Sequence, residues 1–154
     1  MQILTNKEEL GLNNMKKDII VLLGPPASGK GTQSAILSTK FGFCSISTGS
    51  LLRDEVATGS ELGKKIAQLI DKGNLVSDDL MFHVLKKKLE GSDFNGFVLD
   101  GFPRTVSQAS MLFDYVSCSE FNLKKVIVIK LNKNAILDRI GTRITCGTCG
   151  KIYN

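Results

Sequence analysis

The sequence lacks the side chains on which many nucleic-acid-binding modules depend. Its 154 residues include no tryptophan, and aromatic residues make up only 6% of the chain. Modules that recognise single-stranded nucleic acid combine aromatic stacking platforms with a clustered basic stripe. Neither feature is present, so we do not expect a nucleic-acid partner.

Long apolar runs and a disulfide-type cysteine pattern are also missing. The longest strongly apolar stretch, residues 19–23, is far too short to span a bilayer. Residues 1–15 contain acidic side chains where a signal peptide needs an apolar block. Only four cysteines occur, and only two of them lie close together, which fits a reducing compartment. The sequence therefore predicts a cytoplasmic protein without a membrane partner.

The composition does supply the material for one packed domain. Hydrophobic residues make up 42% of the chain and charged residues 23%, which excludes a disordered tail. The net charge of +5 is a mild basic excess that suits phosphorylated ligands.

Strand-like and helix-like segments alternate along the chain. Residues 1–15 show neither period, and we expect a loose N-terminal extension there. A continuous apolar run, typical of a strand buried on both faces of a parallel sheet, occurs at 19–23. Further strands are predicted at 43–46, 97–99 and 126–131, the last an apolar run broken only by Lys130. Helical patterns occur at 32–41, 49–57, 61–72, 77–90 and 107–115. This order predicts an α/β fold with a doubly wound parallel sheet whose ligands bind at the carboxyl ends of the strands.

A glycine-rich segment directly follows the first predicted strand. Residues 24–32 read Gly-Pro-Pro-Ala-Ser-Gly-Lys-Gly-Thr, which has the glycine and lysine spacing of a P-loop. Such glycines let backbone N–H groups surround phosphate oxygens, and Lys30 adds a cation. Because Gly31 follows Lys30, the hydroxyl that often binds magnesium is displaced to Thr32. Asp100, at the end of the third strand, is a candidate for the magnesium shell; the alternative is that it caps the following loop.

Arginine is scarce, with four residues against sixteen lysines, and its planar group binds phosphate at two points. The arginines are Arg53, Arg104, Arg139 and Arg143, and they follow the second, third and fourth predicted strands. We expect them to form a clamp for phosphoryl transfer. The lysine runs, such as 64–65 and 86–88, are interpreted as solvated faces.

Four segments together resemble the adenylate kinase family of nucleoside monophosphate kinases. They are Gly-Pro-Pro-Ala-Ser-Gly-Lys-Gly-Thr-Gln at 24–33, Ser-Thr-Gly-Ser-Leu-Leu-Arg at 47–53, Gly-Asn-Leu-Val-Ser-Asp at 73–78, and Asp-Gly-Phe-Pro-Arg-Thr at 100–105 with Gln108. The resemblance covers about residues 17–154. It implies a P-loop core over 16–46 and 77–138, a helical AMP-binding insert over 47–76, and an incomplete lid over 139–154. The implied reaction is the Mg²⁺-dependent interconversion of ATP and AMP with two ADP.

The same resemblance assigns roles to individual residues. The implied catalytic cations are Lys30, Arg104, Arg139 and Arg143. The residues implied to bind ATP are Ala27, Ser28, Gly29, Lys30, Gly31, Thr32, Arg143, Ile152 and Tyr153. The residues implied to bind AMP are Thr48, Arg53, Asn74, Leu75, Val76, Gly101, Phe102, Pro103, Arg104 and Gln108.

Cys146 and Cys149 resemble the first half of the zinc knuckle in long-lid adenylate kinases. A structural zinc site needs four ligands, and the family's second ligand pair, last strand and last helix have no counterpart in this sequence, so zinc binding stays open. We expect Cys44 and Cys118 to be ordinary buried thiols. The family is usually monomeric, but a missing last strand would leave a sheet edge through which the chain could self-associate.

Two other functions stay open beside an adenylate kinase. A UMP/CMP kinase shares the P-loop and the Thr-Gly segment, although Gln108 and the cysteine-bearing lid favour AMP. A catalytically weak, nucleotide-binding fragment is the second alternative, because the lid is incomplete. The intact Arg104, Arg139 and Arg143 argue against it, since a protein that only binds nucleotide has less need of a transition-state clamp.

Overall fold

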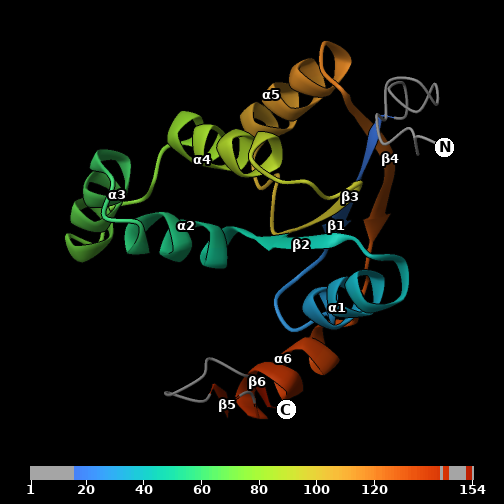
Figure 1. The fold of residues 1–154 in the computed structure, drawn as a ribbon. Coiled ribbons are helices and arrows are strands. Elements are labelled where there is room, and N and C mark those ends of the chain that lie inside the picture. The colour runs from blue at the N-terminus through green and yellow to red at the C-terminus, as the bar shows by residue number, and fades with distance from the viewer. Residues whose placement is uncertain (1–15, 143, 146–151, 154) are drawn as a thin grey trace, which may run out of the picture.

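The computed structural model describes residues 16–142, 144–145 and 152–153. Strands and helices alternate along most of this length (Figure 1). The strands are β1 (Lys17–Leu23), β2 (Cys44–Ser47), β3 (Gly96–Asp100), β4 (Phe121–Val128), β5 (Ile144–Thr145) and β6 (Ile152–Tyr153). The helices are α1 (Lys30–Phe41), α2 (Thr48–Ala57), α3 (Glu61–Asp71), α4 (Asp78–Glu90), α5 (Val106–Ser117) and α6 (Lys133–Thr142). None of these helices is long and apolar enough to cross a bilayer.

The central sheet is parallel, with the strand order β2-β3-β1-β4. Helix α1 lies on one face of the sheet, and α4 and α5 lie on the other (Figure 1). Alternate residues of β1 serve the two faces: Ile19 and Val21 join the cluster that includes α4 and α5, whereas Ile20 and Leu22 pack with Leu37 of α1. The prediction of a doubly wound α/β sheet is therefore confirmed.

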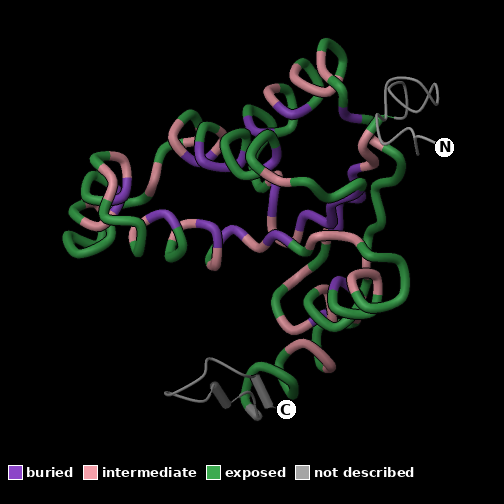
Figure 2. The backbone as a smooth tube through the Cα atoms, in the orientation of Figure 1, coloured by how far each residue is buried: buried purple, intermediate pink, exposed green. Residues whose placement is uncertain are grey.

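The main hydrophobic core lies on the α4 and α5 side of the sheet, where the buried segments gather (Figure 2). Ile19, Phe97 and Leu89 are completely buried. The rings of Phe97 and Phe121 meet edge to face, with their centroids 5.9 Å apart, an arrangement that adds to the stabilisation from burial alone. This core holds the strand ends, and the loops that follow them, in a fixed arrangement.

The fourth strand differs from its prediction. The apolar run at 126–131 was expected to be buried on both faces, but β4 spans Phe121–Val128 and lies at the edge of the sheet. Val126 and Val128 are 51% and 55% exposed. The first half of β4 was missed because its apolar Phe121 and Leu123 alternate with polar residues. Two of these polar residues, Asn122 and Lys124, donate hydrogen bonds to Asp18 of β1. Within the described residues β4 is one of the two edge strands of the sheet.

The two cysteines of the core region also differ from their prediction. Cys44 on β2 is half-buried, but Cys118 is exposed. Cys118 is the residue that caps the end of α5, where its thiol contacts the carbonyl oxygen of Asp114. The interpretation of Cys118 as a buried thiol was wrong, because α5 ends at the surface and not within the core.

Candidate nucleotide site

The loop between β1 and α1 has a backbone that only a glycine-rich sequence allows. Gly24, Ala27 and Gly29 all have positive φ angles, of 151°, 58° and 95°. A Cβ atom on Gly24 would lie 2.6 Å from the carbonyl oxygen of Ile129, so no other residue fits without a shift of backbone. Gly29 precedes α1 and provides no side-chain cap, so the first N–H groups of the helix stay available for an anion.

Two side chains of this loop are arranged for a phosphate ligand. The Lys30 ammonium donates hydrogen bonds to the carbonyl oxygens of Gly24 and Pro25, at 3.0 and 2.9 Å, and so lies folded back along the loop. The Ser28 hydroxyl is buried and, among the described residues, has no hydrogen-bond partner. A buried unsatisfied hydroxyl is costly, and a phosphate oxygen in the loop would satisfy it.

The P-loop forms one wall of a cavity of about 1210 Å³ at the carboxyl ends of β1, β2 and β3. This volume exceeds the range usual for a single small-molecule ligand. Its lining brings together many of the predicted residues from separate parts of the chain: Ala27, Ser28, Gly29, Lys30, Gly31, Thr32, Thr48, Arg53, Asp100, Gly101, Pro103 and Arg104. The described lining does not include the predicted AMP residues Asn74, Leu75, Val76, Phe102 and Gln108.

The wall opposite the P-loop is built from the start of α2 and the loop after β3. The Arg104 guanidinium donates to the Thr48 hydroxyl at 2.7 Å and to the Gly101 carbonyl oxygen at 2.7 Å. Gly101 has a φ of 83°, and a Cβ atom there would lie 3.0 Å from the arginine. The guanidinium of Arg53 lies over Gly49 at the first turn of α2. Two arginines thus stand beside a helix N-terminus, where an anion is favoured.

Gln108 is buried next to this wall, and its amide is held on both sides. Its oxygen accepts a hydrogen bond from the Arg104 backbone N–H at 2.8 Å, and its nitrogen donates to Asp78 at 2.6 Å. Thr105 donates to the other oxygen of Asp78 at 2.6 Å. Asp78 ends the sequence segment 73–78 but was not among the predicted binding residues, so its role in orienting Gln108 was missed. Phe102 lies in the hydrophobic core, 2% exposed, with its ring stacked on Phe82.

The acid and the later arginines have different places. The Asp100 carboxylate reaches the P-loop, since it lies 3.6 Å from the position that a Cβ of Gly31 would take. Arg139 on α6 donates to the carbonyl oxygen of Ala27 at 3.2 Å, so α6 is tied to the P-loop. Arg143 lies outside the described residues, and Ile152 and Tyr153 are described only as strand β6, which pairs with β5.

The predicted zinc ligands Cys146 and Cys149 also lie outside the described residues. Where residues are described, no group of three or more histidine, cysteine, aspartate or glutamate side chains could hold a metal ion.

A second, smaller hollow of about 280 Å³ lies between α2 and α3. Its lining is mostly apolar: Val56, Ala57, Ala67 and Ile70, with Arg53 and Asp71. Arg53 lines both hollows, so the small one adjoins the wall of the large one that carries Arg53 and Arg104. Sequence reasoning missed its apolar residues, because small and branched side chains on two helices carry no signal until the helices pack together.

Comparisons with known proteins agree with this geometry. The sequence model of the adenylate kinase family matches residues 22–145. A protein of Kosmotoga olearia named adenylate kinase is 46% identical over 136 residues, which cover 88% of this chain and 63% of that protein. Similar proteins of the same name occur in Elusimicrobium minutum, at 49% identity, and Archaeoglobus fulgidus, at 42%, with the same coverage. The chain spans 63% of the length of these relatives. The chain belongs to the adenylate kinase family.

Proposed function

We propose that the site transfers the γ-phosphoryl group of ATP to AMP, reversibly, to give two ADP. The observation that carries the proposal is the single large cavity with a P-loop on one wall and the Arg104–Thr48 pair on the other. Two anionic substrates must be held face to face for this reaction, and two cationic walls across one cavity meet that need. The relatives' shared name supports the same reaction.

The P-loop wall would bind ATP. The free N–H groups at the start of α1 and the Ser28 hydroxyl would bind phosphate oxygens, and Lys30 would exchange its carbonyl contacts for the β and γ phosphates. Arg139 and Arg143 would approach from the segment 139–154, which we propose as the start of the lid. Ile152 and Tyr153 would contact the nucleotide from the same segment.

The opposite wall, which carries Thr48, Arg53 and Arg104 and is called the acceptor wall below, would bind AMP. We propose residues 47–76 as the AMP-binding insert. Thr48, Arg53 and Arg104 would bind the AMP phosphate. The apolar hollow between α2 and α3 would receive the adenine ring, since it adjoins Arg53. Gln108 would donate a hydrogen bond to the adenine only after its side-chain amide had given up the hydrogen bond to Asp78. Asn74, Leu75 and Val76 would line the AMP pocket.

Catalysis would come from positioning and charge neutralisation, because phosphoryl transfer needs no covalent group from the protein. Lys30, Arg104, Arg139 and Arg143 would offset the charge that develops on the transferred group. The carboxylate of Asp100 beside Gly31 fits Mg²⁺ brought in by ATP, with the Thr32 hydroxyl as a second candidate. With Mg²⁺ held there, the negative charge of the ATP phosphates would be partly neutralised.

We also propose a cytoplasmic location, where ATP, AMP and ADP are the partners. Structural zinc on Cys146 and Cys149 stays a prediction, and metal analysis of the purified chain, compared with a Cys146→Ser variant, tests it. The oligomeric state is likewise open between a monomer and self-association through β4, which sedimentation at two concentrations distinguishes.

The test of the function is a coupled assay of ADP formation from ATP and Mg²⁺ with AMP, UMP or CMP as the acceptor. Lys30→Ala and Arg104→Ala variants, prepared in parallel, exclude a contaminating host kinase. We expect turnover with AMP that both variants lose. Turnover with UMP or CMP instead would make the chain a UMP/CMP kinase. Binding of both nucleotides by calorimetry without turnover would contradict the proposal and leave a nucleotide-binding fragment.

A further inference from the structure

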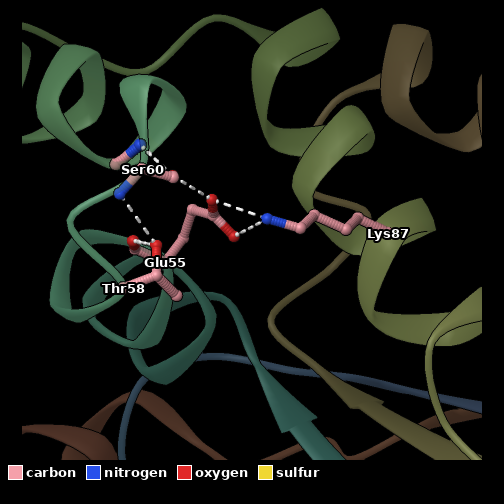
Figure 3. Close-up of polar contacts among 5 residues, drawn as sticks. Glu55, Thr58, Ser60 and Lys87 are labelled. Carbon is pink, nitrogen blue, oxygen red and sulfur yellow. Dashed lines mark hydrogen bonds and ion pairs between the residues drawn. The ribbon is translucent and has the colours of Figure 1, made fainter.

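An ionisable side chain lies buried at the end of α2, outside the nucleotide cavity. The side chain of Glu55 is 7% exposed, although glutamate is almost never buried unless it is paired. Its carboxylate accepts hydrogen bonds from Lys87 to both oxygens, at 2.9 Å each, and a third from the Ser60 hydroxyl at 2.7 Å (Figure 3). These hydrogen bonds hold the pKa of Glu55 below its ordinary value, against the opposing effect of burial, and His83 of α4 adds a smaller attraction.

Lys87 comes from α4, which packs against the core sheet, whereas Glu55 comes from the helix pair α2 and α3 (Figure 1). The sequence placed Lys87 in a lysine run interpreted as a solvated face. Lys87 is exposed, as that interpretation expects, but its ammonium also forms an ion pair with the carboxylate of Glu55. The neighbouring Lys88 is exposed. The ion pair therefore joins two parts of the molecule that lie 32 residues apart in the sequence.

Glu55 also fixes the turn from α2 to α3. The Ser60 hydroxyl that donates to Glu55 accepts the Gly63 N–H at 2.9 Å, and so caps α3. The Thr58 hydroxyl donates to the Glu55 carbonyl oxygen at 2.6 Å. A Cβ atom on Gly63 would lie 2.3 Å from this same oxygen, so the two helices approach as closely as a glycine allows. One residue thus connects α2, α3 and α4.

We propose that Glu55 is a positioning residue, whose ion pair with Lys87 sets the angle of the α2 and α3 pair against α4 and thereby aligns the acceptor wall for AMP. The inference rests on the proposed function, since it assigns AMP to that wall. Thr48 and Arg53 lie on the same helix as Glu55, and the apolar hollow between α2 and α3 depends on the turn that Glu55 braces.

An ion pair suits this role better than further apolar contacts would. The hydrophobic effect itself is non-directional, and the burial of Leu51, Ile66 and Val84 in one core cluster holds α2, α3 and α4 together. A carboxylate held by three hydrogen bonds has a defined direction. The side chain of Lys87 is 53% exposed, so the pair is accessible to substitution without a cavity being left in the core.

The test compares the full-length Lys87→Met variant with Lys88→Met, which removes the same charge one residue further along the same helix. A Lys87→Arg variant restores a cation that can bridge both carboxylate oxygens. Two quantities are measured: the dissociation constants of AMP and ATP by calorimetry, and amide hydrogen exchange of residues 48–71 against 106–117. The exchange measurement needs no nucleotide.

In Lys87→Met we expect exchange of residues 48–71 to be faster, with 106–117 unchanged, and the AMP dissociation constant to rise about tenfold while that of ATP changes less than about twofold. Lys88→Met should match the unsubstituted chain, and Lys87→Arg should recover both quantities. Faster exchange with unchanged AMP affinity would overturn the positioning role and leave a structural brace. Unchanged exchange would overturn the brace as well. If the unsubstituted chain binds no AMP, the proposed function fails, and the exchange measurement alone still decides whether the pair fixes α2 and α3.

Discussion

Gly101 offers the sharpest test of the acceptor wall, because a single methyl group would act there in two ways. Its φ of 83° is a conformation that side chains rarely adopt, so Gly101→Ala should cost about 1–2 kcal/mol from backbone strain. The new Cβ would also lie 3.0 Å from the Arg104 guanidinium and 3.2 Å from the Thr48 hydroxyl. The two groups that we assign to the AMP phosphate would then have to move apart.

Gly42→Ala separates the two effects. Gly42 has a φ of 70° at the end of α1, and a Cβ there would meet nothing within 4 Å. Both variants should therefore unfold roughly 2–8 °C below the unsubstituted chain. Only Gly101→Ala should lose AMP affinity in calorimetry, by roughly tenfold to a hundredfold, since a hydrogen bond to a charged group contributes about 1.5–3 kcal/mol. Unchanged AMP affinity in Gly101→Ala would refute the assignment of this wall.

Three further predictions concern stability. Phe97→Ala should lower the free energy of unfolding in urea by about 3–5 kcal/mol, since the side chain of Phe97 is completely buried. Phe113 is 64% exposed, so Phe113→Ala should change this free energy by less than about 0.5 kcal/mol. Equal losses in the two variants would contradict the assigned core. Gly63→Ala should destabilise the fold by about 1–3 kcal/mol, because the new Cβ would contact the Glu55 carbonyl oxygen. A Cβ on Gly141 would meet nothing within 4 Å, so Gly141→Ala should stabilise the fold by roughly 0.5–1 kcal/mol. Melting temperatures that shift in the same direction in both variants would argue against this packing. The pKa of Glu55 is lowered by its hydrogen bonds, that from Lys87 above all. The carboxylate should therefore contribute its full stabilisation of the fold at pH values well above the ordinary pKa of about 4.3. This stabilisation should be lost as the pH falls through the lower pKa of the folded chain. The stability difference between the unsubstituted chain and Glu55→Gln should accordingly shrink between pH 7 and strongly acidic pH, and a constant difference would show that the carboxylate is not stabilised in the folded state.

Much of the fold could be predicted from local pattern. The run at 19–23 is β-branched and continuous, and the structure places it at the centre of the sheet, covered on both faces. The helical patterns at 61–72 and 77–90 match α3 and α4 to within one residue at each end, and the structure shows that Ser60 and Ser77 cap these two helices. β4 was misplaced because polar residues alternate with apolar ones in its first half, and because the residue that binds them, Asp18, is more than 100 positions away in the sequence. An edge strand does not need to be apolar, so composition alone cannot locate it.

The candidate site divides in the same way. The P-loop and the Arg104 segment are contiguous motifs that follow strand ends, and a parallel sheet brings such loops together, so their meeting in one cavity could be foreseen. The contacts of Asp78 with Gln108 and of Glu55 with Lys87 join residues about 30 positions apart. Each depends on the angle between two helices, and no spacing in the sequence encodes that angle. Sequence patterns thus locate the loops of the site, whereas its orienting contacts require the packed structure.

The most direct test of the central claim follows the phosphoryl group itself. The chain is incubated with Mg²⁺, AMP and ATP labelled at the γ-phosphate, and the labelled products are separated. Transfer across the cavity from the P-loop wall to the Arg104 wall predicts that the label appears in ADP, that no labelled inorganic phosphate accumulates, and that Arg104→Ala abolishes the labelled ADP. Label that stays in ATP, or that is released as inorganic phosphate, would contradict the account.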